Sequence, residues 1–164
     1  HLWRGGHVFG ICGGDQMLGK TINYPEGLDG QVGCSDGLGF LDVETLMTQD
    51  KKLTRVTACY GAKKLGISGY EIHIGRTEGT DCARPFAHVQ GRPEGAQNLN
   101  GQVKGTYLHG LFSNDAFRAE FLSEIGVNSS VTNYDRDMEQ TLDLLAEHVE
   151  QHLDVDEMLS AAGF

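Results

Sequence analysis

A short apolar run that ends in a glycine-flanked cysteine constrains the fold of this chain more than any other stretch. Residues 6–11 are mostly apolar and bounded by glycine, which predicts a buried strand. Residues 10–14 read G-I-C-G-G, the cysteine form of the elbow in which a nucleophile sits between a strand and a helix. Glycines suit such a corner because its backbone is strained and the neighbouring chain approaches closely. The stretch therefore predicts a strand, a corner at Cys12 and a helix over residues 15–22.

Cys12 is the candidate nucleophile, and the N–H of Gly13 is a natural donor to a developing oxyanion. A cysteine nucleophile also needs a base. His109 is the best candidate, because it ends a predicted strand over residues 102–108, and open α/β sheets place their ligands at the carboxyl ends of strands. The alternative is that both residues belong to the core, as most single cysteines and most histidines in apolar runs do.

Three motifs follow one another along the chain. They read G-I-C-G-G-x-Q-M-L-G at residues 10–19, G-Y-E-I-H-x-G-R-T at residues 69–77 and G-T-Y-L-H-G-L-F at residues 105–112. Together they resemble the glutamine amidotransferase domain of the cobyric acid synthase family, over residues 6–159. The resemblance implies an α/β, flavodoxin-like class I glutamine amidotransferase fold, with a central, mostly parallel sheet flanked by helices. It also implies that residues 1–164 form one such domain, without its first strands and without the upstream ATP-dependent ligase domain.

The resemblance further implies the chemistry of a glutaminase. Cys12 would attack the side-chain amide of glutamine, and His109 would act as acid and base. Gln16, one helical turn after the cysteine, is expected to bind glutamine together with Glu71 and His73. The ammonia would pass to the ligase domain, where ATP and Mg²⁺ would drive the amidation of a corrinoid, adenosylcobyrinic acid a,c-diamide, for cobalamin biosynthesis. The amidotransferase domain itself is expected to need no cofactor and no metal.

Two positions depart from related amidotransferases. Leu111 stands where others carry a glutamate two residues after the histidine, so the resemblance implies a Cys–His dyad, oriented by a backbone carbonyl or a water. Asp15 occupies a position where relatives often have an aromatic residue. The nearest alternatives are amidotransferases that act on cobyrinic acid at other positions or on a peptidoglycan lipid. A non-catalytic binding module and a cysteine peptidase are the alternatives from other classes.

Charge and composition restrict the partners and the compartment. The chain has 13 basic and 23 acidic residues, a net charge of −10, which argues against nucleic acid and anionic membrane as partners. The absence of a membrane-length apolar run and of a signal-peptide pattern favours the cytoplasm. The cysteines have no C-x-x-C spacing, so a zinc site has no support. Cys34, Cys59 and Cys82 are predicted to be reduced structural thiols.

The remaining elements are predicted from turn signals and periodicity. A glycine-rich stretch over residues 21–40 predicts a long loop. Strands are expected over residues 38–43, 53–60 and 65–74. Asn100 and Gly101 predict a hairpin turn. Asn114 is expected to cap a helix that ends near Gly126, and an apolar stripe predicts a last long helix over residues 136–152, followed by a short turn capped by Asp154 with Glu157.

Overall fold

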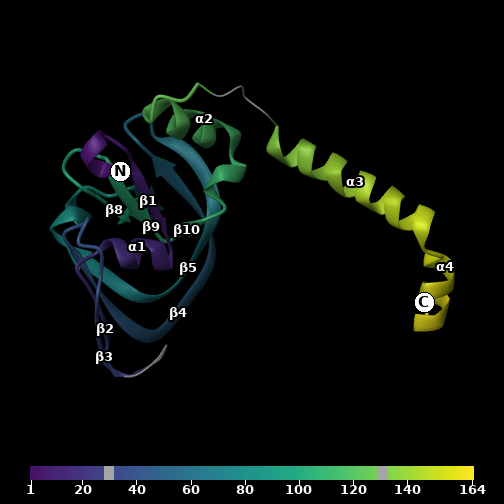
Figure 1. Cartoon of the computed structure of the whole chain (residues 1–164), viewed down its shortest axis with the longest axis horizontal. Coiled ribbons are helices and arrows are strands. Elements are labelled where there is room, and N and C mark those ends of the chain that lie inside the picture. Colours follow the sequence, from purple (N-terminus) through teal and green to yellow (C-terminus); the bar gives the residue numbers. More distant parts are fainter. Residues whose placement is uncertain (28–31, 129–132) are drawn as a thin grey trace.

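The structure, a computed structural model, describes residues 1–27, 32–128 and 133–164 (Figure 1). Its strands are β1 (Val8–Ile11), β2 (Thr21–Tyr24), β3 (Gly33–Asp36), β4 (Val43–Tyr60), β5 (Leu65–Gly79), β6 (Ala87–Val89), β7 (Arg92–Glu94), β8 (Ala96–Gln97), β9 (Val103–Thr106) and β10 (Leu108–His109). Its helices are α1 (Gly13–Leu18), α2 (Asp115–Glu124), α3 (Tyr134–His152) and α4 (Val155–Ala162), with short 3₁₀ turns at Leu2–Arg4, Thr80–Ala83 and Leu111–Ser113.

The described strands form two sheets. The smaller has the order β1-β9-β8, and the larger has the order β10-β5-β4-β2-β3, with β6 and β7 added beside β4. The long strands β4 and β5 form the curved antiparallel hairpin that dominates Figure 1. The domain is mixed α/β with a large sheet flanked by helices, as the resemblance implies.

Strand direction differs from the expectation. Within the described residues only β1–β9 and β2–β4 pair in parallel, and the other pairs are antiparallel. The expectation of a mostly parallel sheet does not describe these strands. The physical reason is their connections, since consecutive strands such as β4 and β5 are joined by short turns, and parallel neighbours need long crossovers.

One chain segment links the two sheets and carries His109. Strand β9 pairs in parallel with β1, in a register that sets Ile11 opposite Thr106. After Tyr107 the chain continues as β10, which pairs with β5 and sets His109 opposite Tyr70. Because β1 and β9 run in the same direction, the residues that follow them, Cys12 and His109, come to the same end of the small sheet.

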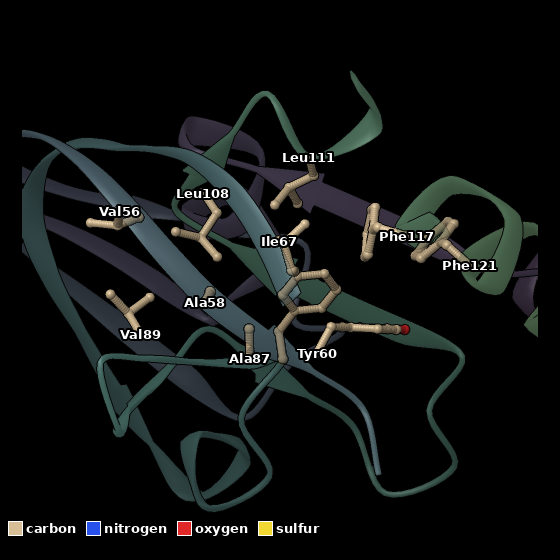
Figure 2. Close-up of a cluster of buried hydrophobic side chains, with 11 residues drawn as sticks. Val56, Ala58, Tyr60, Ile67, Ala87, Val89, Leu108, Leu111, Phe117 and Phe121 are labelled. Carbon is tan, nitrogen blue, oxygen red and sulfur yellow. The ribbon is translucent and has the colours of Figure 1, made fainter. Parts of the chain in front are cut away.

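The core lies between the large sheet and α2 (Figure 2). Aromatic rings form much of it, and tilted or edge-to-face pairs such as Tyr60 with Phe117, 5.0 Å between ring centroids, are favourable geometries for aromatic side chains. A smaller cluster under α1 contains Leu18, Leu41 and Val43. Each buried ring of this kind stabilises the fold by on the order of 2–3 kcal/mol through burial alone. The packing of α2 against the large sheet therefore fixes the position of the segment before α2, which includes β10.

Three predictions between the cysteine corner and β4 are wrong. The first helix ends at Leu18 rather than residue 22, and Thr21–Tyr24 forms β2 against β3 where a loop was expected. Residues 28–31 of that expected loop lie outside the described residues. Residues 38–43 are not a strand before Val43, because the N–H groups of Leu38 and Leu41 donate to the carbonyls that end α1. Backbone groups used to close a helix are not available to a sheet.

The later elements follow the sequence signals more closely. The expected strands over 53–60 and 65–74 lie within the longer β4 and β5, and the turn at Asn100 and Gly101 joins β8 to β9. Asn114 caps α2 by accepting the Phe117 N–H, and Asp154 caps α4 by accepting the Glu157 N–H. Helix α3 confirms the last long helix, and it lies apart from the sheets with no buried residue (Figure 1). Among the described residues, no helix is long and apolar enough to cross a membrane.

Candidate active site

Cys12 sits at a strained corner between β1 and α1. Its φ of 55° and ψ of −118° place a non-glycine residue outside the allowed regions. Such strain costs on the order of 1–3 kcal/mol, persists only where the surroundings impose it, and clusters at functional sites. The strand and the corner predicted from the G-I-C-G-G stretch are confirmed, and the helix after the corner spans Gly13–Leu18 in place of residues 15–22.

Close approach of the backbone explains the glycine before the corner. A Cβ added at Gly10 would lie 2.6 Å from the backbone carbonyl carbon and oxygen of Gly14, in the first turn of α1. No such crowding exists at Gly13 or Gly14. The Cys12 N–H donates to the Thr106 carbonyl at 2.8 Å, which ties the corner to the strand beside it. The elbow is thus held by the helix on one side and by β9 on the other.

Cys12 and His109 meet at one oxygen atom. The Cys12 Sγ–H donates to the backbone carbonyl of Ile72 at 3.3 Å, and His109 Nε2 lies 3.3 Å from the same oxygen. Both side chains are partly buried. The two residues that the sequence singled out, 97 positions apart, thereby come to the same carbonyl oxygen.

Gln16 and Gly13 flank this pair. Gln16 is buried, and its Nε2 donates to the Ile74 carbonyl at 3.0 Å and to the Tyr107 hydroxyl at 3.3 Å. Its amide nitrogen therefore holds the edge of β5 against α1. Gly13 is exposed at the start of the helix, and its N–H has no acceptor among the described residues. That N–H remains free to donate to a substrate oxygen.

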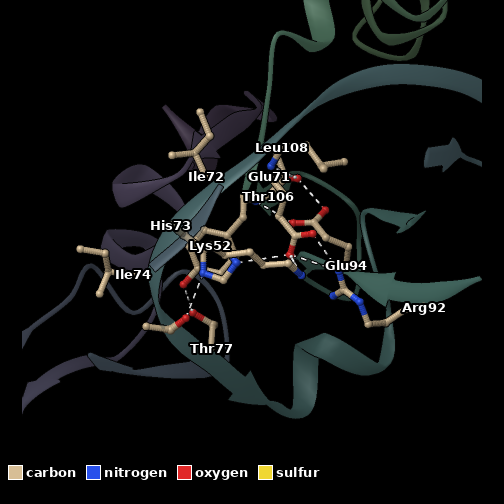
Figure 3. A network of polar contacts seen from close by, with 12 residues as sticks. Lys52, Glu71, Ile72, His73, Ile74, Thr77, Arg92, Glu94, Thr106 and Leu108 are labelled. Carbon is tan, nitrogen blue, oxygen red and sulfur yellow. Dashed lines mark hydrogen bonds and ion pairs between the residues drawn. The ribbon is translucent and has the colours of Figure 1, made fainter. Parts of the chain in front are cut away.

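Glu71 and His73 lie in a polar network on the neighbouring part of β5 (Figure 3). Glu71 is 2% exposed and accepts hydrogen bonds from Lys52 and Arg92, each at 2.8 Å, with His73 Nε2 at 3.3 Å. Burial alone would raise the pKa of Glu71, but the Lys52 hydrogen bond and the Arg92 charge outweigh it and hold that pKa below its ordinary value. His73 stacks on Tyr107 with ring centroids 4.0 Å apart. Among the described residues, no hydrogen bond joins Glu71 or His73 to Cys12 or His109.

A cavity of about 200 Å³ lies beside this network. Asp15, Glu71, His73, Arg92, Glu94 and Tyr107 are among its lining residues. Burial raises the pKa of Asp15 to about 7, and the charge of Glu94 adds to the effect. Burial likewise raises the pKa of Glu94 to about 7. Asp15 Oδ1 is buried with no hydrogen-bond partner among the described residues. The sequence does not predict that Asp15 and Glu94 are buried. A glutamate in a proline- and glycine-rich turn, in particular, gives no sign of burial.

We expect these two acids to make the fold less stable as the pH rises from about 5 to about 8. Their folded pKa values lie above the ordinary 3.8 and 4.5, so the folded state holds more protons than the unfolded state within this window. The free energy of unfolding therefore falls with rising pH until the pH passes the folded pKa values of about 7. Urea unfolding at several pH values measures this fall, and Asp15→Asn should reduce it.

Asp36→Asn is the matched control for this measurement, because Asp36 is exposed. It should leave the pH dependence unchanged. A free energy of unfolding that is constant or rises between these pH values, or an unchanged slope in Asp15→Asn, would contradict the expectation.

Each of the four cysteines lies within the described residues and is a free thiol. Cys34 and Cys59 are exposed rather than packed in the core, which departs from their expected structural role. Within the described part of the chain, no group of three His, Cys, Asp or Glu side chains is arranged to hold a metal ion.

A cysteine on a strand–helix corner, a histidine brought beside it by the adjoining strand, and a mixed α/β sheet are the features of a class I glutamine amidotransferase domain. The CobB/CobQ-like glutamine amidotransferase domain family matches residues 1–117, and the chain belongs to this family.

Similar proteins agree with this membership. The chain is 56% identical over 162 residues to a cobyric acid synthase of Rhodobacter capsulatus, covering 99% of this chain and 34% of that protein. It is 57% identical over 159 residues to a cobyric acid synthase of Jannaschia sp., covering 97% of this chain and 33% of that protein. It is 52% identical over 162 residues to one of Bradyrhizobium diazoefficiens, covering 99% and 34%. The chain thus spans about a third of the length of these curated relatives.

Proposed function

We propose that this chain is the glutaminase domain of a cobyric acid synthase. It would hydrolyse glutamine and supply ammonia for the ATP-dependent amidation of adenosylcobyrinic acid a,c-diamide in cobalamin biosynthesis. The observation that supports glutaminase activity is that Cys12 Sγ and His109 Nε2 each lie 3.3 Å from the Ile72 carbonyl oxygen. The corrinoid acceptor is supported by the relatives, which are called cobyric acid synthases.

The geometry supports a two-step acyl transfer. The Cys12 sulfur attacks the side-chain amide carbon of glutamine, and the Gly13 N–H donates to the oxyanion that forms. His109 takes the thiol proton and gives it to the departing ammonia. A water that loses its proton to His109 then attacks the thioester, which releases glutamate and restores the thiol. General acid–base catalysis of this kind contributes about 10²–10⁴-fold, and one oxyanion donor about 3 kcal/mol.

The other half of the proposed reaction belongs to the ligase domain. Amide formation from a carboxylate requires activation, and ATP with Mg²⁺ would supply it there. No residue of this chain is assigned to that step. Gln16, Glu71 and His73 are proposed to shape the glutamine site, Gln16 by holding the β5 edge and the other two by neighbouring the cavity. We propose the cytoplasm as the compartment, where such biosynthetic enzymes and reduced thiols are found.

A glutamine analogue that carries a diazo-ketone tests the glutaminase proposal. We expect it to label Cys12, and free glutamine to protect that residue, because only a thiol beside a glutamine site would react faster than a surface thiol. Peptide mass spectrometry of the labelled full-length protein locates the modified cysteine. His109→Ala should slow the labelling, since the thiol then loses its base.

The exposed Cys34 and Cys59 are internal controls. Both thiols should react with iodoacetamide, and neither should be labelled by the glutamine analogue. Labelling spread over these exposed thiols, or no labelling of the full-length protein, would reject the proposal in favour of a non-catalytic binding module.

A further inference from the structure

We propose that Glu94 is a positioning residue, which holds the chain segment that sets His109 against Cys12. The inference rests on the proposed glutaminase function, since it concerns the geometry of that pair. Glu94 ends β7 and belongs to none of the three motifs. Its side chain points into the polar network shown in Figure 3.

The segment that Glu94 contacts is where the chain passes from one sheet to the other. Thr106 is the last residue paired with β1, and Leu108 is the first paired with β5. At such a step the backbone leaves one ladder before it enters the next, so its polar groups need other partners. The accuracy with which His109 is placed depends on how these groups are held.

A single carboxylate supplies those partners. The Tyr107 N–H donates to Glu94 Oε1 at 2.6 Å, and the Thr106 hydroxyl donates to Glu94 Oε2 at 2.7 Å. The Leu108 N–H in turn donates to the Thr106 hydroxyl oxygen at 3.1 Å. Glu94 therefore fixes three consecutive residues, two directly and the third through Thr106.

Burial makes these contacts costly to lose. Glu94 is 4% exposed and Thr106 is 0% exposed. A buried N–H that loses its acceptor bears the full desolvation penalty, and the segment can avoid this penalty only by moving. The neighbouring Gly95 is fitted closely to β9, since a Cβ there would lie 2.3 Å from the Gly105 carbonyl oxygen. On the other side, a Cβ at Gly69 would lie 2.4 Å from the His109 carbonyl oxygen.

Movement of this segment would reach both reacting groups. The Thr106 carbonyl accepts the Cys12 N–H at 2.8 Å, and His109 follows Thr106 by three residues. A displacement at Thr106 therefore alters the corner that carries the sulfur and the strand that carries the imidazole. Misplacement of reacting groups by about 1 Å can cost about 10²-fold in rate, so a residue without contact to the substrate can still control turnover.

The test measures glutamine hydrolysis by the full-length protein, at a temperature where circular dichroism shows each variant folded. We expect Glu94→Ala to lower kcat by about 10–100-fold and to change KM by less than about threefold. Glu94→Gln keeps an acceptor for the Tyr107 N–H, so its loss should be smaller. Thr106→Val should add little to Glu94→Ala, because the two side chains act through the same hydrogen bonds.

Asp81→Asn is the matched control. Asp81 is also a buried acid that accepts a backbone N–H, from Asp42 at 2.7 Å, and it pairs with Arg84 rather than with Thr106 or Tyr107. This variant should lower the melting temperature and leave kcat within about twofold. An unchanged kcat in folded Glu94→Ala, or an equal fall in Asp81→Asn, would overturn the inference.

Alkylation by iodoacetamide separates this inference from the proposed function. Glu94→Ala should change the alkylation rate of Cys12 by about fivefold or more relative to the exposed Cys59, whether or not glutamine is turned over. If Cys12→Ala keeps the parent glutaminase rate, the proposed function fails. If Cys12→Ala is inactive but Glu94→Ala matches the parent in both turnover and alkylation, only the positioning role of Glu94 fails.

Discussion

Cys12→Ala is expected to lower glutamine hydrolysis by the full-length protein by at least about two orders of magnitude. The variant removes the only atom at the corner that can form a thioester, and it leaves the oxyanion donor and the fold in place. His109→Ala should cause a loss of similar size. The double variant should be little worse than either single one, because a nucleophile and its base act as a unit. Ammonia release in a coupled assay measures all three.

Two controls sharpen this experiment. Cys59→Ala changes an exposed cysteine and should leave the rate unchanged. Added ammonium salt should restore ATP-dependent amidation in Cys12→Ala, because the proposed ligase domain would use ammonia without needing the thiol. Glutamine hydrolysis that survives Cys12→Ala would reject the mechanism.

Gly10→Ala is expected to destabilise the fold by about 3 kcal/mol and to reduce activity in parallel. The added Cβ would lie 2.6 Å from backbone atoms of Gly14 and from the Leu18 Cδ1. The Gly14 backbone cannot move aside as a flexible side chain can. To relieve the clash, β1 and α1 must therefore move apart, which distorts the corner at Cys12. Urea unfolding measures the lost stability as a lower midpoint at unchanged slope.

Gly14→Ala is the matched control for Gly10→Ala. Nothing lies within 4 Å of a Cβ added at Gly14, and alanine is favoured over glycine in a helix by about 1 kcal/mol. The control should be as stable as the parent or slightly more stable. Equal destabilisation by the two changes would show that close packing at Gly10 does not support the elbow.

The features that could be predicted from the sequence are those with a local cause. The cysteine corner depends on Gly10, two residues before it, and the caps at Asn114 and Asp154 depend on an N–H three residues ahead. His109 also ends a strand, as its immediate neighbours indicate, although the strand predicted over residues 102–108 is divided at Tyr107 into β9 and β10, which lie in different sheets. These predictions agree with the structure because short-range sterics and hydrogen bonds determine them.

The features that escaped prediction depend on contacts distant in sequence. The antiparallel β4–β5 hairpin and the β2–β3 pair are set by register between strands, which residue type alone does not encode. The burial of Asp15 and Glu94 arises only when α1, β7 and β9 are packed together. Strand propensity in residues 21–24 is carried by isoleucine and tyrosine, but the surrounding glycines suggested a loop.

The oxygen that Cys12 and His109 share belongs to the peptide chain itself, so no codon change can delete it. A substitution at position 72 changes the side chain but keeps the carbonyl oxygen. This contact is therefore insensitive to substitution, whereas a side-chain acceptor such as a glutamate would be lost. Replacing the amide between residues 72 and 73 with an ester, which weakens that carbonyl as an acceptor, is the smallest chemical edit that reaches it.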